Sequence, residues 1–138
     1  MKPNLILASH GNLAGELLKS ANMIIGETPD IKTVCMTAED GMKGTTQKMQ
    51  TALDSLEKQP VVIVCDLYGG TPFNVATILS QKRERVRVVT GLNLGMIIEY
   101  SVSDIEDENE LAEYLCLVGK NGVVAPVAGQ DDDDCDIG

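Results

Sequence analysis

The feature that most constrains the fold of this chain is a short, continuously apolar run at residues 60–65. It reads Pro-Val-Val-Ile-Val-Cys and is followed at once by the polar residue Asp66. The run lacks the alternation of apolar and polar residues that marks a strand with one solvated face. A strand buried on both faces is typical of a parallel sheet covered by helices on each side. The run therefore predicts the centre of an α/β sheet.

The rest of the chain alternates between strand-like and helix-like stretches. Short apolar runs favour strands, and apolar residues recurring at intervals of three and four favour helices. The predicted strands are 4–8, 32–36, 60–65 and 85–90, and the predicted helices are 12–25, 41–58, a helix from 71, 96–102 and 108–118. This order predicts a single α/β domain with a mainly parallel sheet flanked by helices, spanning residues 1–128.

Two segments near the C-terminus depart from this alternation. Residues 122–127 (Gly-Val-Val-Ala-Pro-Val) suit a last short strand, and the proline favours a sheet edge or contact with another subunit. Residues 129–138 contain five aspartates and little apolar surface. We therefore expect residues 129–138 to form a disordered acidic tail.

Composition excludes several classes of protein. A net charge of −10, one Phe, three Tyr and no Trp argue against a nucleic-acid partner. A single histidine and four cysteines without CxxC spacing offer no recognised metal site, and thiols of this kind suit a reducing, cytoplasmic setting. No apolar stretch is long enough to cross a bilayer, and neither GxxxxGK[ST] nor GxGxxG is present. We expect a cytoplasmic protein without membrane insertion, metal or nucleotide cofactor.

The polar residues capable of chemistry follow the predicted strands. Ser-His-Gly at 9–11 follows the first strand, Asp-Leu-Tyr-Gly-Gly-Thr at 66–71 follows the third, and Gly-Leu-Asn-Leu-Gly at 91–95 follows the fourth. The carboxyl ends of parallel strands meet along one edge, where ligands bind in open α/β sheets. The three loops are therefore expected to share one rim.

His10, the only histidine of the chain, is the first candidate for covalent chemistry. Asp66 can accept a hydrogen bond from one ring nitrogen, which fixes the tautomer and leaves the other nitrogen as a nucleophile. A purely structural histidine is the alternative interpretation. A hydrolase built from Ser9, His10 and Asp66 is disfavoured, because neighbouring side chains point apart and no GxSxG elbow is present.

The residues around His10 suit a phosphoryl group. Helices beginning near Gly11 and at Thr71 place unpaired N–H groups and a positive dipole end at the rim. Gly69 and Gly70 allow the backbone to approach closely, and the Thr71 hydroxyl can donate to a phosphoryl oxygen. We expect Thr71 to be the N-cap of its helix, with Pro72 as the first helical residue. Each of these features is also common in ordinary loops.

Two stretches resemble a known family. Residues 7–11 (Leu-Ala-Ser-His-Gly) and 66–74 (Asp-Leu-Tyr-Gly-Gly-Thr-Pro-Phe-Asn) resemble the enzyme IIA domain of the mannose family of the bacterial phosphoenolpyruvate-dependent sugar phosphotransferase system. Residues 91–96 look like the third signature loop of that family. The resemblance extends over about residues 2–127, with Gly95 standing where many relatives have proline.

The resemblance implies a phosphotransferase that acts through phosphohistidine without cofactor, nucleotide or metal. His10 would accept a phosphoryl group from the histidine-containing phosphocarrier protein and pass it to a IIB component, and through it to a membrane sugar permease. Asp66 would orient His10, and Thr71 would contact the phosphoryl group. The family forms homodimers that exchange a C-terminal strand, here residues 123–127.

Two alternatives remain open on the residues alone. One is the phosphocarrier subunit of a dihydroxyacetone kinase, which shares the fold and a histidine at a strand end. The other is a regulatory module of the same fold, in which phosphorylation of His10 is a signal without onward transfer. The resemblance further implies a free-standing IIA component, because the chain ends in the acidic tail where some relatives continue into a IIB domain.

Overall fold

The polypeptide folds around one parallel sheet in the computed structural model, which describes residues 2–129. Its strands are β1 (Asn4–His10), β2 (Ile31–Met36), β3 (Val61–Cys65) and β4 (Val86–Thr90). They are ordered β2-β1-β3-β4, and every neighbouring pair is parallel. The prediction of a single α/β domain with a parallel sheet is confirmed.

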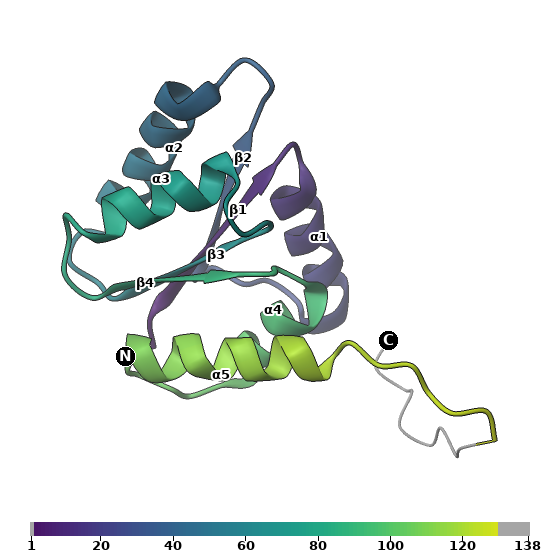
Figure 1. The fold of residues 1–138 in the computed structure, drawn as a ribbon. Helices are drawn as coiled ribbons and strands as arrows, with labels where there is room; N and C mark the ends of the chain where they lie inside the picture. The colour runs from purple at the N-terminus through teal and green to yellow at the C-terminus, as the bar shows by residue number, and fades with distance from the viewer. Residues whose placement is uncertain (1, 130–138) are drawn as a thin grey trace.

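Five helices within the described residues cover the two faces of the sheet (Figure 1). They are α1 (Leu13–Ile25), α2 (Gly41–Ser55), α3 (Thr71–Ser80), α4 (Leu94–Val102) and α5 (Glu108–Asn121). Helices α1, α4 and α5 bury the face that carries Leu5, Leu7, Val62 and Val64. Helices α2 and α3 bury the opposite face. No helix within residues 2–129 combines the length and apolarity that a bilayer crossing needs.

The central strands are buried on both faces, as the apolar run at 60–65 predicts. All five residues of β3 are inaccessible to solvent, and so are residues 6–8 of β1. Alternate residues enter opposite cores: Val62 joins the core under α1, whereas Ile63 joins the core under α2 and α3. Burial on both faces fixes the register of β1 and β3, and with it the position of the loops that follow them.

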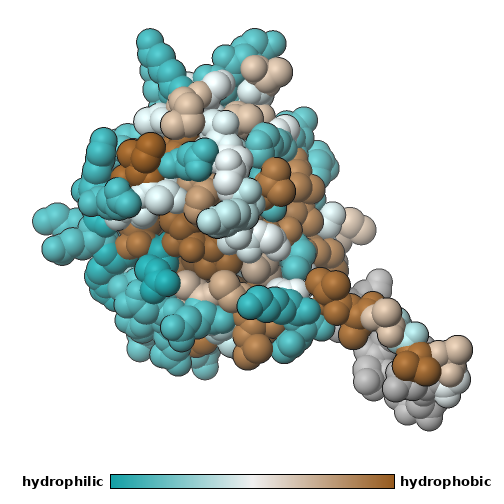
Figure 2. Space-filling model, in the orientation of Figure 1, coloured by the Kyte–Doolittle hydropathy of each residue, from teal (hydrophilic) through white to brown (hydrophobic). Residues whose placement is uncertain are grey.

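The predicted last strand does not form within the described part of this single chain. Residues 123–127 are not assigned to a strand within the described residues, and they lead away from the sheet after α5 (Figure 1). Val123, Val124 and Val127 are 80%, 76% and 67% exposed. Figure 2 shows apolar side chains on this segment, outside the body of the protein. The predicted acidic tail lies outside the described residues, apart from Gly129.

Candidate functional site

The site lies where the connections of the sheet change direction. From β1 the chain runs through α1 to β2 on one side, and from β3 it runs through α3 to β4 on the other. The connections after β1 and β3 therefore diverge from neighbouring strands, and α/β proteins bind ligands at such a switch point. A backbone hydrogen bond from Asp66 N–H to the Ala8 carbonyl, 3.1 Å long, ties the second loop to β1.

His10 and Asp66 are held together by two hydrogen bonds to one carboxylate oxygen. The backbone N–H of His10 donates to Asp66 Oδ2 at 2.9 Å, and His10 Nδ1 lies 2.9 Å from the same oxygen. An ionised carboxylate only accepts hydrogen bonds, so Nδ1 carries the ring hydrogen in this pair and Nε2 keeps a free lone pair. The His10 side chain is 42% exposed and that of Asp66 is 12% exposed. The arrangement presents a nucleophilic nitrogen at the surface.

Ser9 shapes the turn that presents His10, a role that the sequence interpretation missed. Its buried hydroxyl donates to the Gly11 carbonyl at 3.1 Å and accepts the Ala14 N–H at 2.8 Å. The Ser9 hydroxyl therefore caps the start of α1, because the side chain of Asn12, the N-cap residue, makes no capping hydrogen bond. Gly11 closes the turn with a φ of +58°, which favours glycine. A hydroxyl engaged in this way is unavailable as a nucleophile.

The loop after β3 brings the start of α3 beside the His10 ring. Gly69 adopts a φ of +82°, and Gly70 is the N-cap of α3. A Cβ placed on Gly70 would lie 3.2 Å from His10 Nε2, so the free ring nitrogen faces the beginning of this helix. The prediction that Thr71 is the N-cap is wrong by one residue: Thr71 is the first helical residue and Pro72 the second. Glycine is tolerated at an N-cap, and proline fits the first turn.

The loop after β4 has a structural role. Asn93 caps α4 by accepting the Met96 N–H at 3.0 Å, and its amide donates to the Gly119 carbonyl of α5 at 3.3 Å. Gly95 lies inside α4 rather than in the loop. The N–H of Leu92 donates to the Cys65 carbonyl at 3.1 Å and holds the loop against β3.

Three cysteines are further candidate ligands or nucleophiles within the described residues. Burial raises the pKa of Cys65 to about 12, and the neighbouring charge of Asp66 adds to this effect. Cys35 is partly buried and Cys116 is exposed. Within residues 2–129, no three His, Cys, Asp or Glu side chains gather closely enough to hold a metal ion.

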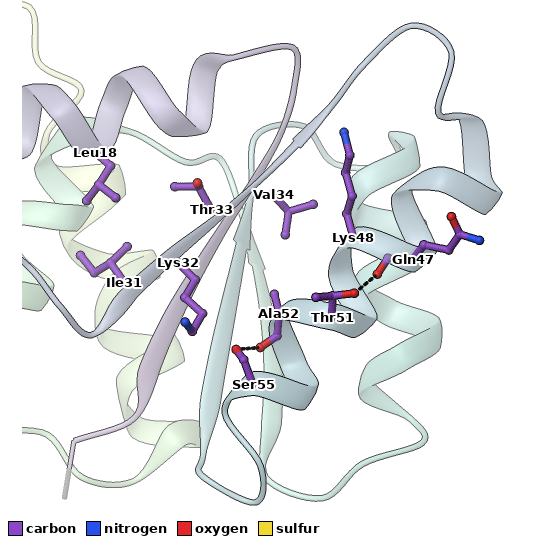
Figure 3. Close-up of a pocket in the computed structure, with 10 residues that line it drawn as sticks. All are labelled: Leu18, Ile31, Lys32, Thr33, Val34, Gln47, Lys48, Thr51, Ala52 and Ser55. Carbon is purple, nitrogen blue, oxygen red and sulfur yellow. Dashed lines mark hydrogen bonds between the residues drawn. The ribbon is translucent and has the colours of Figure 1, made fainter.

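A groove of about 690 Å³ runs along the β2 edge, between α1 and α2, and its lining includes none of the predicted site residues (Figure 3). Three of its polar side chains are engaged within the protein. The hydroxyls of Thr51 and Ser55 donate to carbonyls of α2, at 2.9 and 2.6 Å. Lys48 binds the Cys35 carbonyl and the Asp40 carboxylate, at 2.9 and 2.7 Å. The lysine ion pair lowers the pKa of Asp40.

Comparison with known proteins points to one family. A family model described as the fructose IIA component of the phosphotransferase system matches residues 4–115. A sorbose-specific EIIA component of Lacticaseibacillus casei is 30% identical over 99 residues, which is 72% of each chain. A mannose-specific EIIAB component of Escherichia coli K12 is 27% identical over 88% of this chain, which spans 38% of that longer protein.

A solved structure is similar over nearly the whole fold. The mannose/sorbose specific IIA subunit from Enterococcus faecalis is 45% identical, with a TM-score of 0.90, and the match covers 94% of this chain and 98% of that one. The family match, the curated relatives and this structure agree on one assignment. The chain belongs to the mannose-type enzyme IIA family of the phosphotransferase system, whose members carry phosphoryl groups during sugar uptake.

Proposed function

We propose that His10 accepts a phosphoryl group on Nε2 from the histidine-containing phosphocarrier protein and passes it to a IIB component of a sugar permease. The observation that carries the proposal is the 2.9 Å approach of His10 Nδ1 to Asp66 Oδ2. It assigns the ring hydrogen to Nδ1 and leaves Nε2 as the nucleophile. Because each partner in this relay works in the cytoplasm, the protein would act there.

The transfer is an in-line exchange between two imidazoles. The Nε2 lone pair of His10 forms a bond to phosphorus while the P–N bond of the donor phosphohistidine breaks, and that electron pair returns to the donor ring. The His10 ring gains positive charge in this step, and the Asp66 carboxylate stabilises it through Nδ1–H. Transfer to the IIB component reverses these changes. Positioning and charge stabilisation are what such a transfer needs from the protein.

The start of α3 suits the arriving phosphoryl group. Its first turn has free N–H groups and the positive end of the helix dipole, both of which favour anions. Thr71 lies in this turn, and its hydroxyl can donate to a phosphoryl oxygen. We assign Thr71 and the Gly69-Gly70 turn to the phosphoryl site, together with Gly11 at the start of α1.

Exposed apolar side chains beside His10 support exchange with protein partners. Leu67 and Tyr68, on the loop that carries Asp66, are 60% and 78% exposed, and Leu13 at the start of α1 is 46% exposed. Tyr68 is held against Phe73 with the ring centroids 5.0 Å apart. Exposed apolar surface of this kind marks protein contacts. It fits a relay between proteins better than a pocket for a free sugar.

We also propose that the protein forms a homodimer through strand β4. Within residues 2–129, strand β4 pairs with β3 alone, and a groove of about 460 Å³ beside it has a lining that includes Phe73, Val88 and Val123. The exposed apolar segment 123–127 of a second copy is proposed to pair with this edge. Sedimentation is expected to find a dimer that Val124→Asp converts to a monomer. Val102→Asp, at a comparably exposed position on α4, would leave the dimer intact.

The direct test is reconstitution of the relay. The protein is incubated with labelled phosphoenolpyruvate, enzyme I and the phosphocarrier protein, and a IIB component is added afterwards. We expect an acid-labile, base-stable label that is absent from His10→Ala and moves to the IIB component. Labelling of His10→Ala would refute the role of His10. A label that stays on the protein in the presence of the IIB component would favour the regulatory alternative.

A further inference from the structure

Gly70 is a glycine whose own backbone does not require one. Its φ of −76° and ψ of 170° are extended values that any residue adopts. Gly69, its neighbour, has a φ of +82°, where a side chain is strained, but the space around it is open to 4 Å. The two adjacent glycines are therefore needed for different reasons. At position 70 the reason is space.

The space at Gly70 is occupied by the His10 ring. A Cβ at position 70 would lie 2.7 Å from His10 Cε1 and 3.2 Å from Nε2. Ordinary contact begins at 3.4 Å, so a side chain at position 70 would displace Cε1 by about 0.7 Å. The ring atom bonded to Cε1 is held in place, because Nδ1 lies 2.9 Å from Asp66 Oδ2. A displaced ring loses its hydrogen-bond geometry to Asp66.

The amide of Gly70 is already engaged. Its N–H donates to the Leu67 carbonyl at 3.2 Å, and its carbonyl accepts the Asn74 N–H at 2.9 Å. Gly70 therefore contributes to the site through its lack of a side chain, because its N–H is not free to bind the phosphoryl group. This sharpens the general assignment of the Gly69-Gly70 turn to the phosphoryl group.

We infer that Gly70 is a positioning residue for the transfer, because its missing Cβ lets the His10 ring keep Nδ1 on Asp66 while Nε2 faces the start of α3. The inference rests on the proposed function, in which Nε2 is the phosphoryl acceptor. It predicts that any side chain at position 70, even a methyl group, moves the ring and slows the transfer without removing a ligand of the phosphoryl group.

The first readout is the ring itself, measured in the unphosphorylated protein. Long-range ¹H–¹⁵N spectra of His10 are expected to show the Nδ1–H tautomer in the natural protein and a mixture of tautomers in Gly70→Ala. Gly69→Ala is expected to lower the midpoint of urea unfolding while the ring keeps its Nδ1–H signature. An unchanged ring signature in Gly70→Ala would overturn the inference, whether or not His10 is phosphorylated.

The second readout is the rate of His10 phosphorylation by the phosphocarrier protein. Gly70→Ala is expected to lower it at least tenfold. Gly15→Ala, whose new methyl would meet only an ordinary 3.6 Å contact with Cys35 Sγ, is expected to transfer at the natural rate. Transfer at the natural rate in Gly70→Ala, with a displaced ring, would also overturn the inference. Absence of His10 phosphorylation in the natural protein would instead overturn the proposed function.

A double-mutant cycle covers the case in which Gly70→Ala folds poorly. If the collision with the ring causes the defect, Gly70→Ala lowers the unfolding midpoint in the natural protein but not in a His10→Ala background. Equal losses in both backgrounds would show that position 70 needs glycine for another reason, and the inference would fail.

Discussion

Replacing Asp66 tests how much of the transfer depends on one hydrogen bond. Asp66 Oδ2 accepts both the backbone N–H and the ring Nδ1–H of His10. Only the ring bond changes during the reaction, because the ring gains positive charge as Nε2 binds phosphorus. The bond between Nδ1–H and the carboxylate is therefore stronger in the transition state than in the resting protein, which is the condition for an effect on rate.

The magnitude follows from the kind of bond that is lost. A hydrogen bond to a charged group contributes about 1.5–3 kcal/mol, and 1.4 kcal/mol is about tenfold in rate. Asp66→Ala is therefore expected to slow phosphorylation of His10 by about 10- to 150-fold. Asp66→Asn keeps an acceptor oxygen without the charge, and a neutral bond is about half as strong. We expect Asp66→Asn to be slowed by about 4- to 12-fold.

Rapid-quench measurement of His10 phosphorylation with limiting phosphocarrier protein provides the assay. Glu16→Gln is the matched control, because it removes an exposed carboxylate on α1 whose ion pair is with Lys19 of the same helix. It is expected to retain the natural rate. The reasoning is refuted if Asp66→Ala transfers as fast as the natural protein, or if Asn and Ala at this position are equally slow.

Three further predictions concern stability. Burial raises the pKa of Cys65 from 9.0 to about 12. As the pH rises from 9 to 12, the thiol therefore ionises in the unfolded chain before it ionises in the folded protein, and the folded protein loses stability. The free energy of urea unfolding is expected to fall more steeply with pH over this range for the natural protein than for Cys65→Ala. Tyr100→Phe removes a buried 2.6 Å hydrogen bond to the Pro3 carbonyl and is expected to cost about 1–3 kcal/mol in thermal unfolding. Asp107→Ala removes the cap that accepts the Glu110 N–H and is expected to cost about 1 kcal/mol, most of which Asp107→Ser restores.

The order of the helices and strands could be predicted from the sequence, because a strand that is buried on both faces has a continuously apolar sequence. The apolar run of β3 is typical of the centre of a parallel sheet, and such a sheet needs helices to cover both of its faces. Residues 123–127 show the limit of such patterns. A strand needs a partner strand as well as apolar side chains, and within residues 2–129 this segment forms no strand.

Part of the candidate site could be predicted from the sequence, because of the topology of the sheet. The ends of β1 and β3 are neighbours in a parallel sheet, so His10 and Asp66 were expected on one rim, and their ring nitrogen and carboxylate lie 2.9 Å apart. The buried hydroxyl of Ser9 and the empty space at Gly70 depend on distances between atoms that no spacing in the sequence encodes. The pattern Ser-His-Gly before a helix was the available signal for Ser9.

The most direct test of the account identifies the atom that carries the phosphoryl group. ³¹P and ¹H–¹⁵N correlation spectra of the phosphorylated protein distinguish the two ring nitrogens of His10. The account predicts phosphorus on Nε2, with a hydrogen retained on Nδ1 beside Asp66. Phosphorus on Nδ1, or on a residue other than His10, would contradict it.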